Sequence, residues 1–464
     1  MRSFLRVLLY GLCAVVLCHC ASPLPDPASG TEPRRKVRIS SETGLLTYRE
    51  SRRIIQQLDA RGQAGDFLAR HLQVEEAVTD APLVVGNEVR LFGDGPSTYR
   101  AMEEAIGAAR RFIHLESYIF EDDRIGNLVA EMLIAKRAQG VAVAVMVDDI
   151  GTLSVPPDLF DRMRQAGVQV VFFNPVNPLK SRGNWSLNER SHRKILVVDG
   201  EIAFIGGINL SDVYASRPVA GSSARAHEAE GRQDAPWRDT HISIRGPAVP
   251  DVERVFLEGW RSQGGPPLGD IDFLPQQPRR GPHVVRILVN RPGSADNHAI
   301  YLTLLSAINS SQRSVHITMA YFVPDPGFIA ALGDAARRGV DVTLLLPGFS
   351  DFSIVLHAGR SHYEELLEAG VKIYERKDVL LHAKTAVVDG VWSTAGSSNL
   401  DWRSFTLNHE INAVILGADF GTQMEALFER DRQASVPVVL EQWKKRPLTA
   451  RFKEFMSRLL ERWL

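Results

Sequence analysis

Residues 191–209 read SHRKILVVDGEIAFIGGIN, and residues 381–399 read LHAKTAVVDGVWSTAGSSN. Both stretches carry His, Lys, Asp, Gly and Asn at the same intervals. One residue separates the His from the Lys, four separate the Lys from the Asp, and six separate the Asp from the Gly. A single His-x-Lys-x4-Asp pattern arises by chance, whereas two copies in identical phase indicate a duplication. The repeat therefore predicts that two parts of the chain bring these residues together at one site.

The repeat extends from this motif to two whole α/β units. In each unit buried strands alternate with helices, and a Gly ends a helix just before a strand at Gly140 and Gly339, and again at Gly167 and Gly370. The predicted elements of the first unit are 88–92, 97–110, 112–119, 126–139, 141–147 and 168–173, and those of the second are 284–289, 297–308, 314–321, 327–338, 340–346 and 371–374. We predict an α/β fold of two tandem repeats, each a mixed sheet flanked by helices, that form one pseudo-two-fold site.

The 464 residues are comfortable for two domains, and the composition is that of a globular protein. A Gly- and Pro-rich stretch at 261–282 is interpreted as the linker between the halves, and loops at 174–190 and 215–237 are candidates for substrate selection. The predicted organisation is a signal segment at 1–20, a tether with a helical N-terminal segment at 21–81, α/β domains at 82–264 and 283–435, and a basic amphipathic tail at 436–464.

The N-terminus is typical of an export signal. Arg2 and Arg6 precede an uncharged apolar run at 7–18 that is too short to span a bilayer comfortably. The run ends in LCHCAS, which resembles a bacterial lipoprotein box with Cys20 as the lipidated residue; the alternative is an uncleaved N-terminal anchor. Either interpretation predicts a bacterial, membrane-associated protein on the exported, periplasm-facing side.

The tail at 441–464 interleaves aromatic and aliphatic residues with lysines and arginines. A helix of this kind can lie in a membrane interface, with its apolar residues inserted and its cations on anionic headgroups. The alternative is an ordinary helix that packs on the body and exposes a solvated basic face.

The repeated residues suit the chemistry of a phosphodiester. A neutral imidazole can attack phosphorus, and an imidazolium can protonate the leaving oxygen, so His192 and His382 could share these two roles. Lys194 and Lys384 supply compact cations for the phosphoryl oxygens. Because residues two apart on a strand face the same way, each His and its Lys are expected to point to one ligand.

The remaining motif residues complete the candidate site. Asn209 and Asn399 are neutral donors for phosphate oxygens. Asp199 and Asp389 belong to the candidate catalytic set as motif residues, but their Asp-Gly sequences predict that they hold a turn rather than touch substrate.

Both copies match HxKxxxxDxxxxxxG(G/S)xN, the signature of the phospholipase D superfamily. Within that superfamily the chain resembles the bacterial cardiolipin synthases, and the resemblance covers roughly residues 82–440. Further stretches that carry it are IHLESYIF (113–120), WRDTHISIRGPAV (237–249) and SSNLDWRSFTLNHEINAVI (397–415). The resemblance implies two phospholipase D-like repeats.

The resemblance also implies roles for individual residues. His192 would be the nucleophile that forms a covalent phosphohistidine, and His382 the general acid. Asp239 and Glu410 match the acidic residues that steady the two histidines. The resemblance implies no metal and no cofactor, which agrees with the absence of cysteine beyond residue 20 and of a His/Asp cluster at ligand spacing. His114 and His316, at equivalent strand positions, are interpreted as core packing.

The function that the resemblance implies is a membrane phosphatidyltransferase that makes cardiolipin from phosphatidylglycerol and releases glycerol. The expected partners are phospholipid substrates and a membrane surface; the oligomeric state stays open. A hydrolase that yields phosphatidic acid is the first alternative. A nuclease fits the motif, but a net charge of −1 and the lack of a basic, aromatic groove pattern disfavour nucleic acid as a partner. A non-catalytic lipid-binding scaffold is disfavoured because every motif His and Lys is present.

Overall fold

The structure is a computed structural model of the chain, and it describes residues 36–58, 67–181, 183, 185–216, 235–294 and 298–464. The predicted signal segment, Cys20, most of the predicted tether and most of the 215–237 loop lie outside the described residues. Everything below concerns one compact unit, residues 32–464.

The first half forms a mixed sheet. Its strand order is β6 (Gln169–Phe173), β5 (Ala142–Asp148), β4 (Phe112–Ser117), β8 (Ile195–Val198), β9 (Ile202–Gly206), β11 (His241–Arg245) and β3 (Leu83–Phe92). The strands from β6 to β4 are parallel and the rest of this sheet is antiparallel. One face packs on α4 (Gly95–Ala108), α5 (Arg124–Ala138) and α6 (Pro157–Gln165), and the other packs on α8 (Val249–Ser262).

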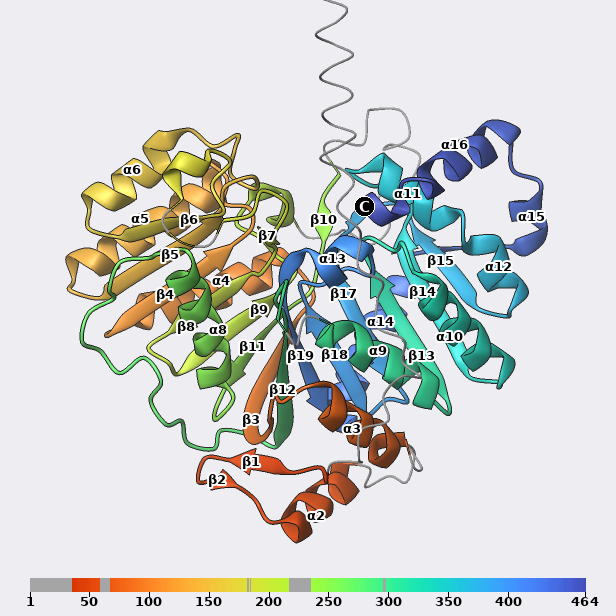
Figure 1. Cartoon of the computed structure of the whole chain (residues 1–464), viewed down its shortest axis with the longest axis horizontal. Coiled ribbons are helices and arrows are strands. Elements are labelled where there is room, and N and C mark those ends of the chain that lie inside the picture. Colours follow the sequence, from red (N-terminus) through yellow and green to blue (C-terminus); the bar gives the residue numbers. More distant parts are fainter. Residues whose placement is uncertain (1–35, 59–66, 182, 184, 217–234, 295–297) are drawn as a thin grey trace, which may run out of the picture. The chain divides into compact units, whose positions relative to one another are not determined.

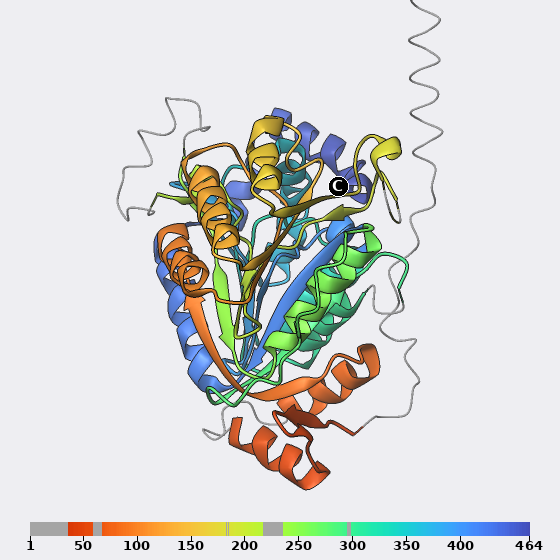
Figure 2. The ribbon, with the colours of Figure 1, turned by 90° about the vertical axis from the view of Figure 1, so that its left-hand side faces the viewer.

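The second half repeats this order. Its strands are β15 (Lys372–Arg376), β14 (Asp341–Pro347), β13 (Ser314–Met319), β17 (Lys384–Val388), β18 (Trp392–Gly396), β19 (Asn408–Leu416) and β12 (His283–Asn290). Its helices include α9 (Ala299–Ser310), α10 (Pro326–Arg337), α11 (Ser353–Arg360), α12 (Tyr363–Glu368) and α14 (Ala418–Gln433). In the side view, α4 and α14 lie on one side of the sheets, and α8 and α9 lie on the other (Figure 2). Equivalent helices on opposite sides are what a two-fold relation between the halves requires.

The predicted strands and helices of both α/β units are present, and most ends agree within two or three residues. The largest difference is β3, which begins at Leu83 rather than at residue 88. The added stretch ends in Gly86 and Asn87, which locally disfavour a strand, and the strand continues through them because this stretch pairs with distant segments. Leu83 and Val84 pair with β1 (Ile39–Ser41), and Val84 and Val85 pair with β12.

β3 joins the two sheets at the centre of the unit (Figure 1). Its residues 88–92 pair with β11 of the first half, while Val84 and Val85 pair with β12 of the second. A single apolar core fills the space between the sheets and includes Ile205 and Ile242 from the first half with Ala413 and Ile415 from the second. The halves therefore share both backbone hydrogen bonds and a core.

The predicted helical N-terminal segment contains two helices, α2 (Tyr48–Leu58) and α3 (Phe67–Val78). A short hairpin of β1 and β2 (Gly44–Leu45) precedes them. The fully buried carboxylate of Glu75 on α3 accepts hydrogen bonds from Arg286 (2.8 Å) and from the indole of Trp392 (3.0 Å), and it pairs with His71. Because a buried carboxylate needs such partners, this network ties α3 to the second half.

The amphipathic tail is helical but does not form a single helix. The tail consists of α15 (Leu440–Lys444), α16 (Leu448–Arg458) and a final 3₁₀ turn, η5 (Glu461–Trp463). Pro447 separates the two helices, because proline has no N–H for a helical hydrogen bond and disfavours the helical conformation of the residue before it. None of the helices among the described residues is both long and apolar enough to cross a bilayer.

Candidate active site

Each motif histidine follows a two-residue strand that pairs with the other half. β7 (Arg190–Ser191) pairs in parallel with the start of β19, and the N–H of His192 then donates to the carbonyl of His409 (3.0 Å). β16 (Leu380–Leu381) pairs in the same way with β10 (Trp237–Arg238), and the N–H of His382 donates to the carbonyl of Arg238 (2.8 Å). The backbone at both histidines is thus held from across the pseudo-two-fold axis.

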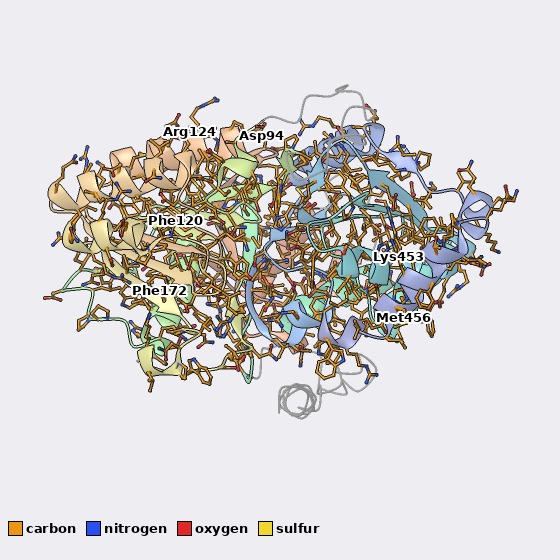
Figure 3. The ribbon with its side chains drawn as sticks, turned by 90° about the horizontal axis from the view of Figure 1, so that it is seen from above. Asp94, Phe120, Arg124, Phe172, Lys453 and Met456 are labelled. Carbon is orange, nitrogen blue, oxygen red and sulfur yellow. The ribbon has the colours of Figure 1, made fainter. Side chains whose placement is uncertain are left out.

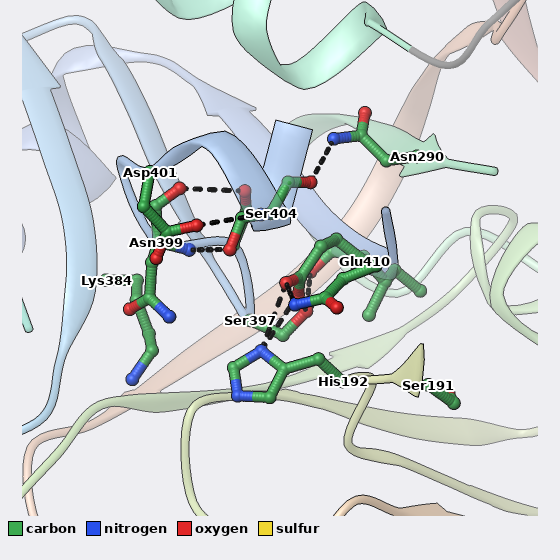
Figure 4. Close-up of polar contacts among 12 residues, drawn as sticks. Ser191, His192, Asn290, Lys384, Ser397, Asn399, Asp401, Ser404 and Glu410 are labelled. Atoms are coloured by element: carbon green, nitrogen blue, oxygen red, sulfur yellow. Dashed lines mark hydrogen bonds and ion pairs between the residues drawn. The ribbon is translucent and has the colours of Figure 1, made fainter. Parts of the chain in front are cut away.

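The carboxylates that contact the histidines also come from the opposite half. Nδ1 of His192 lies 3.1 Å from both oxygens of Glu410, and Nδ1 of His382 lies 2.7 Å from Oδ2 of Asp239 (Figure 4 shows the first pair). Asp239 and Glu410 are equivalent: each stands two residues before the strand residue that pairs with Gly206 or Gly396. Both carboxylates are fully buried.

These contacts define the protonation state of the histidines. Burial, with Lys194 nearby, lowers the pKa of His192 to about 4 despite the opposing effect of Glu410. Burial alone would raise the pKa of Glu410, but His192 and Lys194 hold it below its usual value. At neutral pH the His192 imidazole is therefore neutral, its Nδ1–H donates to Glu410, and the lone pair of Nε2 is free to react.

His382 stands in a similar field. Burial and the neighbouring Lys384 lower its pKa, and Asp239 opposes them. The Asp239 carboxyl keeps a pKa below its usual value, because Lys384 and His382 outweigh the effect of its burial. The ring of His382 is enclosed by aromatic side chains, with Trp237 at 4.9 Å and Tyr214 at 6.0 Å between ring centroids. This enclosure restricts the ring to one orientation.

The two motif lysines are buried beside their histidines. Nζ of Lys194 donates to the carbonyl of His192 (2.6 Å), and Nζ of Lys384 lies 2.9 Å from Nδ1 of His382. Burial lowers the pKa of Lys194 to about 7 and that of Lys384 to about 8. Such cations lack a full complement of carboxylate partners and favour an anion beside them. Both motif histidines and both motif lysines were expected on strands, but only Lys384 lies on one. His192 and Lys194 come just before β8, and His382 comes just before β17.

The interpretation of Asp199 and Asp389 as turn residues is confirmed. Asp199 accepts backbone N–H groups of residues 110, 111 and 112, and Asp389 accepts those of residues 312, 313 and 314. Both adopt positive φ (55° and 52°), as does the glycine that follows each. This is the tight turn in which Asp-Gly is favoured, and it joins β8 to β9 and β17 to β18.

The two motif asparagines differ in their contacts. Asn209 uses its amide within the protein: Oδ1 accepts from the N–H of Ile119 (3.1 Å), and Nδ2 donates to the hydroxyl of Tyr214 (3.1 Å). The Oδ1 atom of Asn399 is buried without a hydrogen-bond partner among the described residues. In the close-up the amide of Asn399 lies beside Lys384, above the ring of His192 (Figure 4). Asn399 therefore has the freer amide for a ligand.

The residue after the motif glycine also differs between the halves. Oγ of Ser397 donates to Glu410 (2.5 Å) and so fixes the carboxylate that contacts His192. Gly207 takes the same place in the first copy, and a Cβ built there would lie 2.2 Å from Oδ1 of Asp239. The shorter Asp239 side chain comes so close to the backbone that only glycine fits.

Three residues of the site were not singled out from the sequence. Glu116, buried on β4, accepts a hydrogen bond from Oγ of Ser191 (2.5 Å), next to His192. Tyr118 places its ring against both His192 and Lys194, with centroid distances of 5.2 and 5.3 Å. The hydroxyl of Tyr214 lies 3.4 Å from Nδ1 of His382. A carboxylate within the apolar run FIHLES was the available signal for Glu116.

His114 packs in the core as expected, whereas His316 is only partly buried, and each pairs with a carboxylate. His114 lies 2.6 Å from Glu253 of α8, and His316 lies 2.6 Å from Glu425 of α14. These equivalent pairs tie a helix to the sheet in each half. In the part of the chain that the structure describes, no three His, Cys, Asp or Glu side chains gather as a metal site requires.

The arrangement supplies two buried imidazoles, each held by a carboxylate, and two buried ammonium groups with lowered pKa values. This set can bind a phosphate, attack its phosphorus from one side and protonate a leaving oxygen on the other.

Comparison with known proteins agrees with this site. The family described as "Cardiolipin synthase, PLD-like domain" matches residues 102–217 and 304–432. A cardiolipin synthase of Geobacillus sp. (strain WCH70) is 34% identical over 430 residues, which cover 92% of this chain and 82% of that protein. One of Geobacillus thermodenitrificans (strain NG80-2) is 36% identical with the same coverage.

The fold is also that of a solved structure. The phosphatidylserine synthase of Haemophilus influenzae Rd KW20 superposes with a TM-score of 0.59 at 14% identity, over 85% of this chain and all of that one. The repeated motif, the crossed histidine–carboxylate pairs and these matches together identify the family of this chain. The chain belongs to the phospholipase D superfamily and, within it, to the family of cardiolipin synthase-like phosphatidyltransferases.

Proposed function

We propose that this phosphatidyltransferase makes cardiolipin from two molecules of phosphatidylglycerol, through a phosphatidyl group carried on His192. Nε2 of His192 attacks phosphorus, the bond between phosphorus and the glycerol oxygen breaks, and His382 gives its proton to that oxygen. His382 then takes the proton of a hydroxyl on the second phosphatidylglycerol, whose oxygen attacks phosphorus. The phosphorus–nitrogen bond breaks and His192 is restored. Cardiolipin and glycerol are the products.

The crossed pairs of His192 with Glu410 and of His382 with Asp239 carry this proposal. Each carboxylate fixes Nδ1–H toward itself, so Nε2 is the reactive atom of each ring. Burial lowers the pKa of both rings, so both are neutral before substrate binds, and His192 is assigned as the nucleophile because the family resemblance gives that role to the histidine of the first motif copy. His382 acquires its proton when the phosphate anion enters beside it, since a nearby negative charge favours the imidazolium. Lys194, Lys384 and Asn399 would hold the phosphoryl oxygens.

The test is the product profile. Purified protein on phosphatidylglycerol vesicles should yield cardiolipin and glycerol in equal amounts, measured by mass spectrometry and an enzymatic glycerol assay. Phosphatidic acid without cardiolipin would mean that water is the acceptor and that the chain is a hydrolase. Cardiolipin formed only when phosphatidylethanolamine is added would assign a different donor or acceptor.

We further propose that the chain works on the exported side of a bacterial membrane, held by its N-terminal segment, with Cys20 as a lipidated residue. The support is the sequence alone, since these residues lie outside the described ranges. Mass spectrometry of the N-terminal peptide should find Cys20 as the acylated first residue. An unmodified, intact N-terminus would favour the uncleaved anchor instead.

A further inference from the structure

Helix α16 packs with its polar side inward and its apolar side outward. Its buried residues are Glu454 and Ser457, whereas Leu448, Phe452 and Phe455 are 80%, 64% and 58% exposed. In most surface helices the apolar stripe faces the core and the polar stripe faces water. Exposing several large apolar residues together on one helix is unfavourable in water and marks a surface that meets something else.

The inward polar side is bound by specific ion pairs. Arg446, at the break before α16, pairs with Glu454 (2.9 Å) on the helix and with Glu364 (3.1 Å) on α12. His362 is buried and lies 3.1 Å from Glu461, and the last residue, Leu464, packs among Val323, Val355 and Ala358. The orientation of the helix is therefore set by its own contacts with α11 and α12, and it leaves the apolar side free.

The outward side is a continuous stripe. Leu448, Phe452, Phe455, Met456 and Leu459 follow one another at helical spacing, so they share one face. Leu460 and Trp463, in the turn that follows, are 46% and 48% exposed. We call these seven residues the tail stripe.

Basic residues border the tail stripe. Arg451 and Arg458, seven residues apart, form a row along one edge, and Lys453 lies beyond the other edge. All three are exposed and, among the described residues, none of them has a carboxylate within ion-pair distance. Figure 3 shows Lys453 and Met456 on the outer surface of α16, seen from above. An apolar stripe bordered by unpaired cations matches the boundary between acyl chains and anionic headgroups.

A second group of exposed apolar residues lies in the loops of the first half. Leu153 is 69% exposed after β5, and Leu179, Trp185 and Leu187 are 92%, 42% and 50% exposed in the loop that leads to β7. The segment around residue 180, yellow in Figures 1 and 2, lies at the same end of the unit as α11 and α16. β7 and β10, which hold the backbone beside the two histidines, lie between these two groups (Figure 1).

We propose that the tail stripe and its basic border dock on an anionic phospholipid bilayer, and that residues 150–153, 176–181 and 185–187 in the loops of the first half enter the same surface on the other side of the active site. The inference deepens the proposed function, because it names the partner that presents the lipid substrates, but the docking itself requires no turnover. A second copy of this chain is the other occupant that could cover an apolar stripe, and the test separates the two.

The test places an environment-sensitive probe on the stripe of the full chain. The only three cysteines are Cys13, Cys18 and Cys20, so changing them to Ser leaves a chain without thiols. In that chain, with His192→Ala added to stop turnover, Met456→Cys carries a nitrobenzoxadiazole label. Leu45→Cys is the matched control, since Leu45 is also exposed, at 60%, but lies on β2 at the opposite end of the unit (Figure 1).

On vesicles of equal phosphatidylglycerol and phosphatidylcholine, the label at position 456 should brighten several-fold and shift to the blue, and lipid-phase quenchers should reach it. The label at position 45 should not change, even if the N-terminal segment anchors the chain. Arg451→Glu with Arg458→Glu should weaken the response by roughly fivefold per residue, as should added salt.

Three results would overturn the proposal. The label at 456 could stay in water while the chain sediments with the vesicles, it could respond equally on pure phosphatidylcholine, or it could change with protein concentration in the absence of lipid, which would assign the stripe to a second copy. Turnover is read separately, with the histidine restored, on a water-soluble short-chain phosphatidylglycerol. Phe452→Ser with Phe455→Ser should keep that activity while losing turnover on vesicles, so failed docking and failed catalysis give different readings.

Discussion

Glu410 of the second half holds Nδ1 of His192 of the first half at 3.1 Å through both carboxylate oxygens, and Oδ2 of Asp239 holds Nδ1 of His382 in the reverse direction at 2.7 Å. Neither half therefore contains a motif histidine together with the carboxylate that holds it. The two motif copies work only as parts of one shared site, and the first predictions concern that dependence.

Removing either histidine should abolish turnover, but with different trapped species. The His382→Ala variant, quenched with detergent at neutral to mildly alkaline pH during reaction with labelled phosphatidylglycerol, should keep label on the protein, since attack by His192 remains possible. His192→Ala should leave none. Label on the His192→Ala variant, detected by intact mass spectrometry, would exchange the roles of the two residues.

Neutralising the carboxylates should lower turnover without unfolding the chain. Glu410→Gln and Asp239→Asn keep the size of each side chain but remove the charge that fixes the ring and stabilises its imidazolium. We expect kcat to fall by about 10²- to 10⁴-fold with a smaller change in KM. Glu425→Gln, beside His316 and away from the motif histidines, is the matched control and should leave kcat within a few-fold of the unaltered chain.

Gly207→Ala should disable the His382 side of the site. A Cβ at this position would lie 2.2 Å from Oδ1 of Asp239, so the carboxylate must move away from the ring it holds. Turnover should fall by roughly 100-fold or more. Ser397→Ala, at the equivalent position, only removes the hydrogen bond to Glu410 and should lower turnover by about tenfold or less, equivalent to about 1.4 kcal/mol or less. Similar losses in the two variants would contradict this account.

The pH profile of kcat/KM should report the buried bases. His192 must be neutral to attack, so activity should fall as the pH drops through about 4. Lys194 and Lys384 must be charged to hold the phosphate, so activity should fall as the pH rises through about 7 to 8. Lys194→Arg should move the alkaline limb upward, because arginine stays charged. An unchanged alkaline limb would assign it to another group.

The turn aspartates should matter for stability first. Asp389 accepts three backbone N–H groups and is buried, so Asp389→Ala should lower the free energy of unfolding by about 3 kcal/mol, measured by urea denaturation. At low temperature, where the variant is folded, its activity should fall far less than that of a histidine variant. An unchanged unfolding midpoint would mean that the three hydrogen bonds are replaced by water.

Much of this molecule follows from local patterns in the chain. The strands and helices of both α/β units could be predicted, because alternation and periodicity of apolar residues record burial one residue at a time. The positions that meet the histidines, Asp239 and Glu410, followed from the family resemblance. Their crossing between halves did not, because it depends on the short β7 and β10 strands, which are too brief to leave a local signal.

The tail shows a different limit. Its composition predicted an amphipathic helix, and the spacing of Leu448, Phe452 and Phe455 is that of one face. Periodicity identifies two faces but does not say which one meets the protein. The inward face is fixed by Arg446, which pairs with Glu454 on α16 and with Glu364 on α12. The pair with Glu364 joins segments that are distant in sequence, so it leaves no local pattern. Pro447 is the local signal for the break between α15 and α16.

Because the two halves are joined covalently, their equivalent positions are free to differ. In a symmetric dimer of identical subunits, both histidines would contact carboxylates of the same residue type. The positions equivalent to 207 and 397 would also have to carry the same residue. Here Gly207 leaves space for the carboxylate of Asp239, and Ser397 donates a hydrogen bond to Glu410. A duplicated gene could thus divide one bifunctional group into a dedicated attacker and a dedicated proton donor, each adjusted by mutations that leave the other untouched.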